Sequence, residues 1–106
     1  MSEQAKPQFK TESDSSKKTL ILAEDDEALR EMITLLLKTQ GYTVIAVADG
    51  QAGITALQSH PEAAFIISDV SMPSMDGIEF LKLSRDIRKV PFIMMTGFSD
   101  IMDMPK

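Results

Sequence analysis

The chain has 106 residues, a net charge of −5 and no cysteine. This length allows one domain, and the lack of cysteine excludes disulfides and thiolate metal sites. Four lysines and three acids leave residues 1–18 at +1, so residues 19–106 carry −6, which argues against binding to a nucleic-acid backbone. No apolar run is long enough to span a bilayer and no secretion signal is evident, so we expect a cytoplasmic protein that does not bind membranes.

Residues 1–18 are rich in Ser, Lys, Glu and Gln, and Phe9 is the only large apolar side chain after Met1. Such a segment buries too little apolar surface to order itself, so we expect a flexible tail before a single domain at residues 19–106.

Short apolar runs alternate with helical patterns from Thr19 onward. Apolar, mostly β-branched runs predict strands at residues 19–23, 42–47, 64–68 and 91–95. Helical spacing of apolar residues and capping signals predict helices at residues 26–40, 51–59 and 78–87. The first helix is expected to pack through Leu29, Met32, Ile33, Leu36 and Leu37. The third is expected to pack through Ile78 and Leu81, with Phe80, Leu83 and Ile87 as further candidates. Residues 96–106 are expected to form a loop that begins another helix. This alternation is typical of an α/β fold in which helices cover both faces of a parallel sheet.

Three of the predicted strands are followed by polar residues at their carboxyl ends. The acids 24–27 follow the first strand, Asp69 follows the third, and Thr96-Gly97 follows the fourth. Carboxyl ends of parallel strands meet at one edge of a sheet, where ligands bind in folds of this class. Carboxylates gathered there suit Mg²⁺, and a carboxylate can also attack phosphorus to form an aspartyl phosphate. The Thr96 hydroxyl would then be placed to hydrogen-bond the phosphoryl group.

Each of these signals taken alone has a simpler interpretation. The acid run from Glu24 to Glu27 is typical of a helix start that complements the helix dipole, and Asp69 after a strand is typical of a turn. The joint pattern is more specific, because acids at two strand ends and a hydroxyl at a third rarely coincide in so short a chain. We interpret Asp26 and Asp76 as helix caps.

The segments LILAEDDEALREM (20–32), SDVSMPSMDGIEFL (68–81) and PFIMMTG (91–97) resemble the receiver domain of bacterial two-component response regulators. The resemblance covers Thr19 to about Asp100, and it implies a flavodoxin-like doubly wound parallel sheet of strand order 2-1-3-4. It also implies that Asp69 is the phosphoacceptor and Thr96 the switch hydroxyl. Glu24, Asp25, Asp69 and the backbone carbonyl of Ser71 would bind Mg²⁺, while Pro73 and Gly77 would shape the loop after Asp69.

The resemblance further implies a partner that carries phosphohistidine, either a sensor histidine kinase or a histidine phosphotransfer protein, and a role in phosphorelay signal transduction. The protein would not be an enzyme, beyond phosphorylating and dephosphorylating itself. A phosphohydrolase is disfavoured, because that class has an Asp-x-Asp pattern after its first strand and this chain has Glu-Asp-Asp-Glu.

Receiver domains continue with a fifth strand, which ends in a phosphate-binding lysine, and a last helix. Lys106 comes too early to be that lysine, so we expect the sequence to be a fragment in which the fourth strand forms an open edge. Open edges pair with other chains, which predicts a homodimer. A second hypothesis is therefore an interaction module that works without phosphorylation or does not switch.

Two further features receive simple interpretations. His60, the only histidine, precedes a proline at a helix end and is expected to be exposed and not catalytic. The basic residues Lys82, Arg85, Arg88 and Lys89 are expected to complement the dipole of the helix at 78–87; docking of a partner is the alternative.

Overall fold

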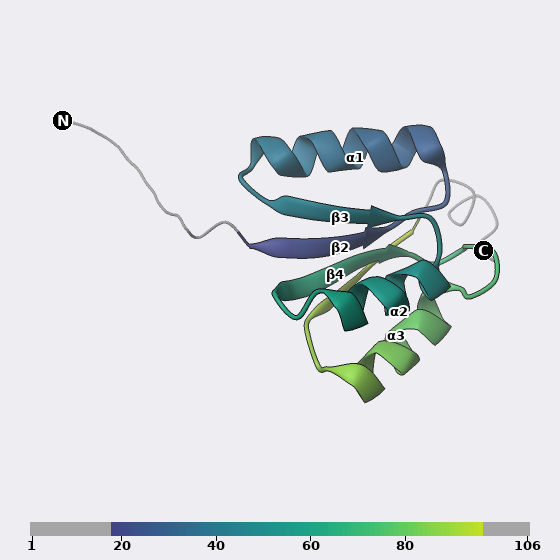
Figure 1. Cartoon of the computed structure of the whole chain (residues 1–106). Helices are drawn as coiled ribbons and strands as arrows, with labels where there is room; N and C mark the ends of the chain where they lie inside the picture. Colours follow the sequence, from purple (N-terminus) through teal and green to yellow (C-terminus); the bar gives the residue numbers. More distant parts are fainter. Residues whose placement is uncertain (1–17, 97–106) are drawn as a thin grey trace.

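The computed structural model describes residues 18–96 of the chain, so the predicted tail and the segment after Thr96 lie outside the described residues. The described elements alternate between strands and helices (Figure 1). In chain order they are β2 (Thr19–Ala23), α1 (Glu27–Thr39), β3 (Thr43–Val47), α2 (Gly50–Ser59), β4 (Ala63–Asp69), α3 (Gly77–Ile87) and β5 (Phe92–Met95).

All strand pairs are parallel, and the sheet has four strands in the order β3-β2-β4-β5. In chain order this is 2-1-3-4, as predicted, with β5 at one edge of the described sheet. The predicted strand positions are confirmed to within a residue or two. The third strand is longer than expected, because it includes Asp69 as its last residue.

Each helix begins at an aspartate whose side chain accepts a hydrogen bond from the backbone N–H three residues later. Asp26, Asp49 and Asp76 make these bonds at 3.1, 2.8 and 2.9 Å, which satisfies one of the free N–H groups at each helix start. The caps predicted at Asp26 and Asp76 are confirmed. Helix α1 ends before Gly41, whose φ of 96° lies in the left-handed region that favours glycine.

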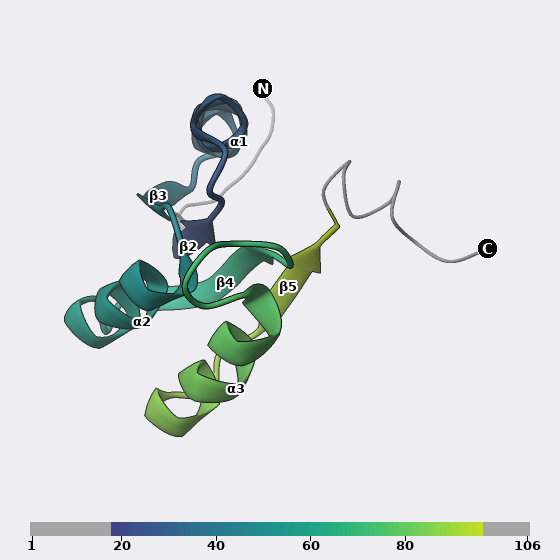
Figure 2. The same ribbon diagram turned by 90° about the vertical axis from the view of Figure 1, so that its right-hand side faces the viewer.

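Helices α2 and α3 cover one face of the sheet, and α1 lies on the other (Figure 2). The side chains of Ile21, Leu57, Ile66 and Phe80 form the centre of the core on the first face, and all four are fully buried. In α3 the inward residues are Gly77, Phe80 and Ser84. The predicted inward position of Ile78 is wrong, since 46% of this residue is exposed.

Of the residues expected to form the packed face of α1, Leu29, Ile33 and Leu37 are partly buried, but no residue of this helix is fully buried. Met32 and Leu36 are 53% and 59% exposed. The physical reason lies in the placement of α1, which lies over β3 and β2 and leaves this face of β4 and β5 uncovered by any described helix (Figure 2). Among residues 18–96, no helix is long and apolar enough to cross a membrane.

Candidate phosphoacceptor site

The site lies at the carboxyl edge of the sheet, where β2, β4 and β5 end side by side. Glu24 directly follows β2, Asp69 ends β4, and Thr96 directly follows β5. The pairing register aligns these ends, because Ala23 lies opposite Ser68 and Asp69 lies opposite Met95. Parallel pairing thus brings together residues that are far apart in the sequence, as expected for this fold class.

Three carboxylates meet at this edge. Carboxylate oxygens of Glu24, Asp25 and Asp69 lie within 4.8 Å of one another. Glu24 and Asp69 are buried, with exposures of 2% and 6%, whereas Asp25 is exposed. Oxygen ligands at this spacing suit a hard divalent cation, and an exposed ligand leaves room for the waters that Mg²⁺ retains. The donor set therefore fits Mg²⁺.

The charges in this cluster are costly without a cation. Burial raises the pKa of the Glu24 carboxyl above its ordinary value, and the negative charges of Asp69 and Asp25 raise it further. The hydrogen bond from the Asp26 N–H, at 3.0 Å, partly opposes this rise in pKa. A divalent cation would remove the repulsion that remains.

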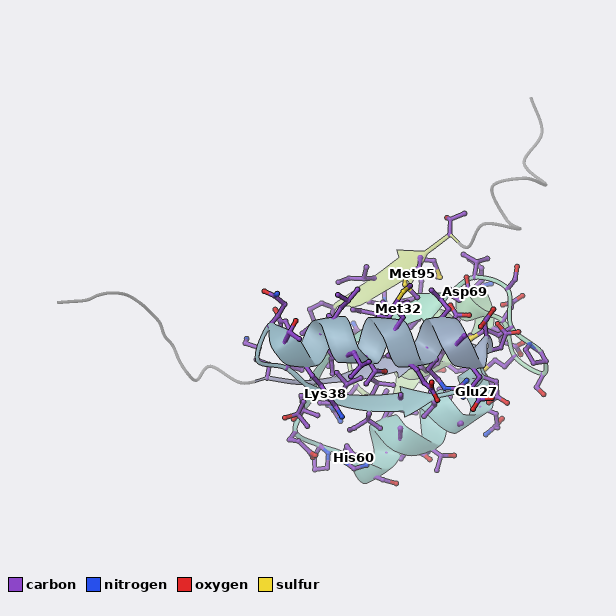
Figure 3. All side chains as sticks on the ribbon, turned by 90° about the horizontal axis from the view of Figure 1, so that it is seen from above. Glu27, Met32, Lys38, His60, Asp69 and Met95 are labelled. Carbon is purple, nitrogen blue, oxygen red and sulfur yellow. The ribbon has the colours of Figure 1, made fainter. Side chains whose placement is uncertain are left out.

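Asp69 is held by hydrogen bonds from neighbouring groups, and Figure 3 places it at the end of the molecule where Glu27 begins α1. Its Oδ1 accepts a hydrogen bond from the Val70 N–H at 2.9 Å, and its carbonyl accepts one from the Ser68 hydroxyl at 2.9 Å. The Gly77 N–H donates to the Val70 carbonyl at 2.8 Å and closes the loop. A Cβ atom at Gly77 would collide with the Asp69 carbonyl oxygen. Glycine is therefore required for this close approach, which supports the predicted role of Gly77 in shaping the loop.

The remaining predicted residues are placed near the edge, but their roles stay predictions. Ser71 is exposed and begins the loop two residues after Asp69, and Thr96 is exposed at the end of β5. His60 is half-buried and its Nδ1 lies 3.1 Å from Glu62 Oε2. It precedes β4 and so lies at the amino end of that strand, away from Asp69.

Sequence patterns did not single out Arg30, and they gave Arg88 a different role. Arg30 Nη1 donates to the Glu24 carbonyl at 2.9 Å. The available signal was its position, since a cation near the start of a helix opposes the helix dipole and needs another partner. Arg88 donates to the carbonyls of Leu57, His60 and Ala63 at 3.4, 3.3 and 2.8 Å. It therefore joins the end of α3 to the α2–β4 connection.

A parallel sheet of this strand order with helices on both faces and acids at its carboxyl edge places the chain in the flavodoxin-like class of α/β proteins, which includes CheY. Residues 20–106 match the family model of the response regulator receiver domain. The chain therefore belongs to the receiver domains of two-component response regulators, and the predicted family is confirmed.

Similar proteins agree with this assignment. The DNA-binding response regulator MtrA of Mycolicibacterium smegmatis is 28% identical over 86% of this chain and 40% of its own length. The transcriptional regulatory protein CseB of Streptomyces avermitilis is 34% identical over 80% of this chain and 36% of its own. The chain thus spans well under half of these relatives.

Solved structures show the same fold. The chemotaxis protein CheY4 of Vibrio cholerae superposes with a TM-score of 0.70 at 29% identity, covering 81% of this chain and 76% of that one. The receiver domain of the Francisella response regulator 1452 gives a TM-score of 0.71 at 23% identity, covering 77% and 68%.

Proposed function

We propose that this receiver domain takes a phosphoryl group onto the Asp69 carboxylate and thereby acts as a signalling switch. The observation that carries the proposal is the cluster of Glu24, Asp25 and Asp69, with carboxylate oxygens within 4.8 Å and two of the three residues buried. Placing like charges together in a partly buried site lowers the stability of the fold. The presence of these three acids at the ligand-binding edge of the sheet is therefore best explained by a function that needs them.

In the proposed reaction, an oxygen of the Asp69 carboxylate attacks the phosphorus of a phosphohistidine. The phosphorus–nitrogen bond breaks, its electron pair stays on the imidazole, and Asp69 becomes an acyl phosphate. Bound Mg²⁺ would neutralise the phosphoryl oxygens during transfer. Glu24, Asp25, Asp69 and the Ser71 carbonyl would hold that ion, and the Thr96 hydroxyl would donate a hydrogen bond to the new phosphoryl group.

The phosphohistidine donor is a sensor histidine kinase or a histidine phosphotransfer protein, and the reaction takes place in the cytoplasm, where ATP supplies the phosphoryl group. The domain is a substrate of its donor and not a turnover enzyme. Its own chemistry is limited to taking phosphate from small donors and to losing it by hydrolysis.

Intact-mass spectrometry after incubation with Mg²⁺ and acetyl phosphate tests the proposal. We expect a single phosphate adduct in the unmodified chain and in Asp86→Asn, which changes an exposed acid on α3. The adduct should be absent in Asp69→Asn. No adduct at saturating donor, or an adduct that persists in Asp69→Asn, would refute phosphorylation at this residue.

A second candidate function is self-association without phosphorylation. It rests on β5, which is an edge strand of the described sheet and has Ile93 51% exposed. Unprotected edge strands pair with other chains. Light scattering across a wide concentration range would show a dimer; a monomeric mass at the highest concentration would count against this function.

A further inference from the structure

Arg30 connects helix α1 to the acidic turn that follows β2. Its Nη1 donates a hydrogen bond of 2.9 Å to the backbone carbonyl of Glu24, in a partly buried position. The two residues lie on opposite sides of the turn that links β2 to α1. The bond therefore closes this turn from the helix side.

Glu24 is held at three points, by the end of β3, by the residue that caps α1 and by a residue within α1. Its N–H donates to the Val47 carbonyl at the end of β3, at 3.0 Å. Its carboxylate accepts from the N–H of Asp26, the residue that caps α1, at 3.0 Å. Its carbonyl accepts from Arg30. Of these three bonds, the one from Arg30 is made to the peptide between Glu24 and Asp25. The orientation of this peptide sets the direction in which the chain continues from Glu24 to Asp25.

Asp25 depends on this restraint more than the other two acids do. Glu24 and Asp69 are buried at 2% and 6% exposure, so packing limits their positions, whereas Asp25 is exposed. A metal ligand on an exposed turn is positioned chiefly by the hydrogen bonds of its backbone. Groups that orient metal ligands in this way contribute substantially to affinity.

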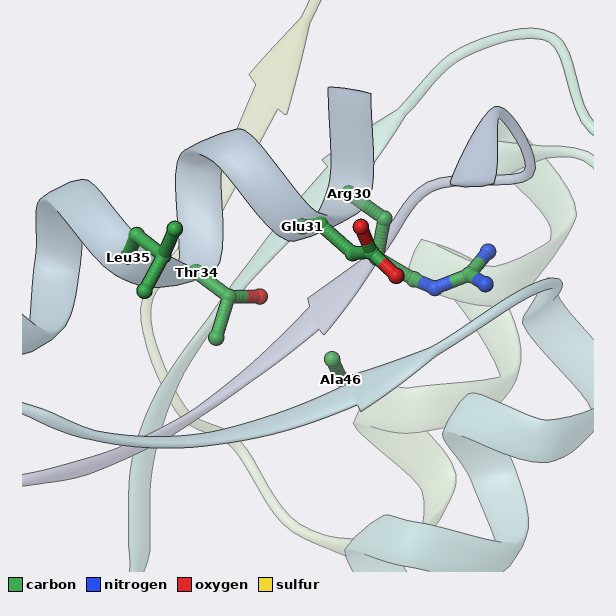
Figure 4. A pocket seen from close by; sticks show the side chains of 5 residues that line it. All are labelled: Arg30, Glu31, Thr34, Leu35 and Ala46. Carbon is green, nitrogen blue, oxygen red and sulfur yellow. The ribbon is translucent and has the colours of Figure 1, made fainter. Parts of the chain in front are cut away.

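The surroundings of Arg30 suit an anchoring role and not a core packing role. Its side chain lines a groove of about 330 Å³ between α1 and β3, together with Glu31, Thr34, Leu35 and Ala46 (Figure 4). Figure 4 shows the guanidinium group extending away from Thr34 and Leu35. The aliphatic part of the Arg30 side chain thus lines the groove, while its guanidinium group bonds to the backbone of the acidic turn.

We propose that Arg30 is a positioning residue for the metal site, which holds the Glu24 carbonyl so that Asp25 is presented to the ion together with Glu24 and Asp69. The inference rests on the proposed Mg²⁺-dependent function. It assigns to α1 a part in ion binding through a residue that does not itself touch the ion.

Calorimetric titration of the full chain with Mg²⁺ tests the inference. Arg30→Met removes the donors while keeping an unbranched stem, and Arg30→Lys keeps a donor and the charge. Arg85→Met removes an exposed cation from α3 as the matched control. We expect Arg30→Met to weaken Mg²⁺ binding about 10-fold, Arg30→Lys to weaken it less, and Arg85→Met to leave it unchanged.

A second measurement separates positioning from general destabilisation. At Mg²⁺ concentrations that saturate each variant, phosphorylation by acetyl phosphate should return to the unmodified level in Arg30→Met, because the defect lies in ion affinity. Should Arg30→Met fail to fold, Arg30→Gln, which also lacks the guanidinium group but keeps a polar, unbranched side chain, carries the same comparison.

The possible results distinguish failure of the positioning role of Arg30 from failure of the proposed Mg²⁺-dependent phosphorylation. If the unmodified chain binds Mg²⁺ and both Arg30 variants bind it equally well, the positioning role is refuted and the proposed function stands. If the unmodified chain does not bind Mg²⁺, the proposed function itself fails and the role of Arg30 fails with it.

Discussion

Replacing Glu24 with glutamine is expected to stabilise the metal-free protein and to remove most of its stabilisation by Mg²⁺. Glutamine keeps the size of the side chain and an oxygen that can accept the hydrogen bond from the Asp26 N–H. It removes one of three acidic groups from a cluster in which Glu24 and Asp69 are buried and Asp25 is exposed. The change therefore isolates the charge of Glu24 from its packing.

The magnitude follows from the geometry of the site. Carboxylate oxygens of the three acids lie within 4.8 Å of one another, and two unit charges at that distance repel by about 3.5 kcal/mol at an effective dielectric constant of about 20. Solvent at the exposed Asp25 reduces its share. We therefore expect Glu24→Gln to raise the free energy of unfolding by about 1–3 kcal/mol without metal.

The pH dependence of the metal-free protein has a definite sign. Burial and the nearby charges of Asp69 and Asp25 raise the pKa of the Glu24 carboxyl in the folded state above its ordinary value of 4.5. Above pH 4.5 the unfolded chain releases a proton that the folded chain still holds, so stability falls as pH rises through the raised pKa. Glu24→Gln should flatten this fall.

Urea unfolding followed by circular dichroism provides the assay, with EDTA or with Mg²⁺ at about 100 times its dissociation constant. Mg²⁺ at that concentration should stabilise the unmodified chain by about 2.7 kcal/mol, and Glu24→Gln by much less. Glu31→Gln, which neutralises an exposed acid on α1, serves as the matched control. A Glu24→Gln variant that is less stable than the unmodified chain in EDTA, or equally stabilised by Mg²⁺, would refute the reasoning.

Three other substitutions have defined expectations, each measured by urea unfolding. Gly77→Ala places a methyl group against the Asp69 carbonyl, so it should lower the free energy of unfolding by about 1–3 kcal/mol and also slow phosphorylation. An unchanged urea midpoint would show that the loop can shift to accept the methyl group without loss of stability. Arg88→Met removes three hydrogen bonds to carbonyls at the α2–β4 connection and should cost about 2 kcal/mol, with Mg²⁺ affinity unchanged because these carbonyls lie far from the carboxyl edge. Asp76→Ala removes the cap that accepts from the Glu79 N–H at 2.9 Å and should cost about 1 kcal/mol, whereas Asp76→Asn should restore most of it.

The strands and the acidic site were predictable because their signals are local or follow from topology. Apolar runs and acid stops located β2 and β4, and parallel pairing then required Glu24, Asp25 and Asp69 to meet at one edge. The caps at Asp26 and Asp76 depend on residues only three positions away. No knowledge of the packed structure was needed for these predictions.

The inward face of α3 could not be predicted from periodicity. This helix has apolar residues around much of its circumference, so several faces fit the pattern. The structure buries Phe80 between the small residues Gly77 and Ser84 and leaves Ile78 46% exposed. Which face turns inward is decided by the fit against α2 and the sheet, because a large ring flanked by small residues packs closely there.

The two arginines show a second limit. Arg88 reaches carbonyls 25 to 31 residues earlier in the chain, and no sequence spacing indicates such a contact. The bond from Arg30 to Glu24 spans only six residues, but it depends on the angle at which α1 leaves the turn. Every residue has a backbone carbonyl, so a charged side chain that bonds to one has no partner of a particular residue type. The sequence therefore contains no pattern that reveals such a contact.

Helix α1 and strand β2 are held in the fold to very different degrees. Four of the five residues of β2 are completely buried, whereas α1 buries none. Local opening of α1 should therefore require far less free energy than opening of β2, so that the helix frays and re-forms many times for each global unfolding event. The acidic turn joins the two elements. An ion or phosphoryl group bound at this turn would contact the end of the buried strand and the start of the exposed helix at once. Its binding would lower the frequency of local opening of α1 while β2 stays in place.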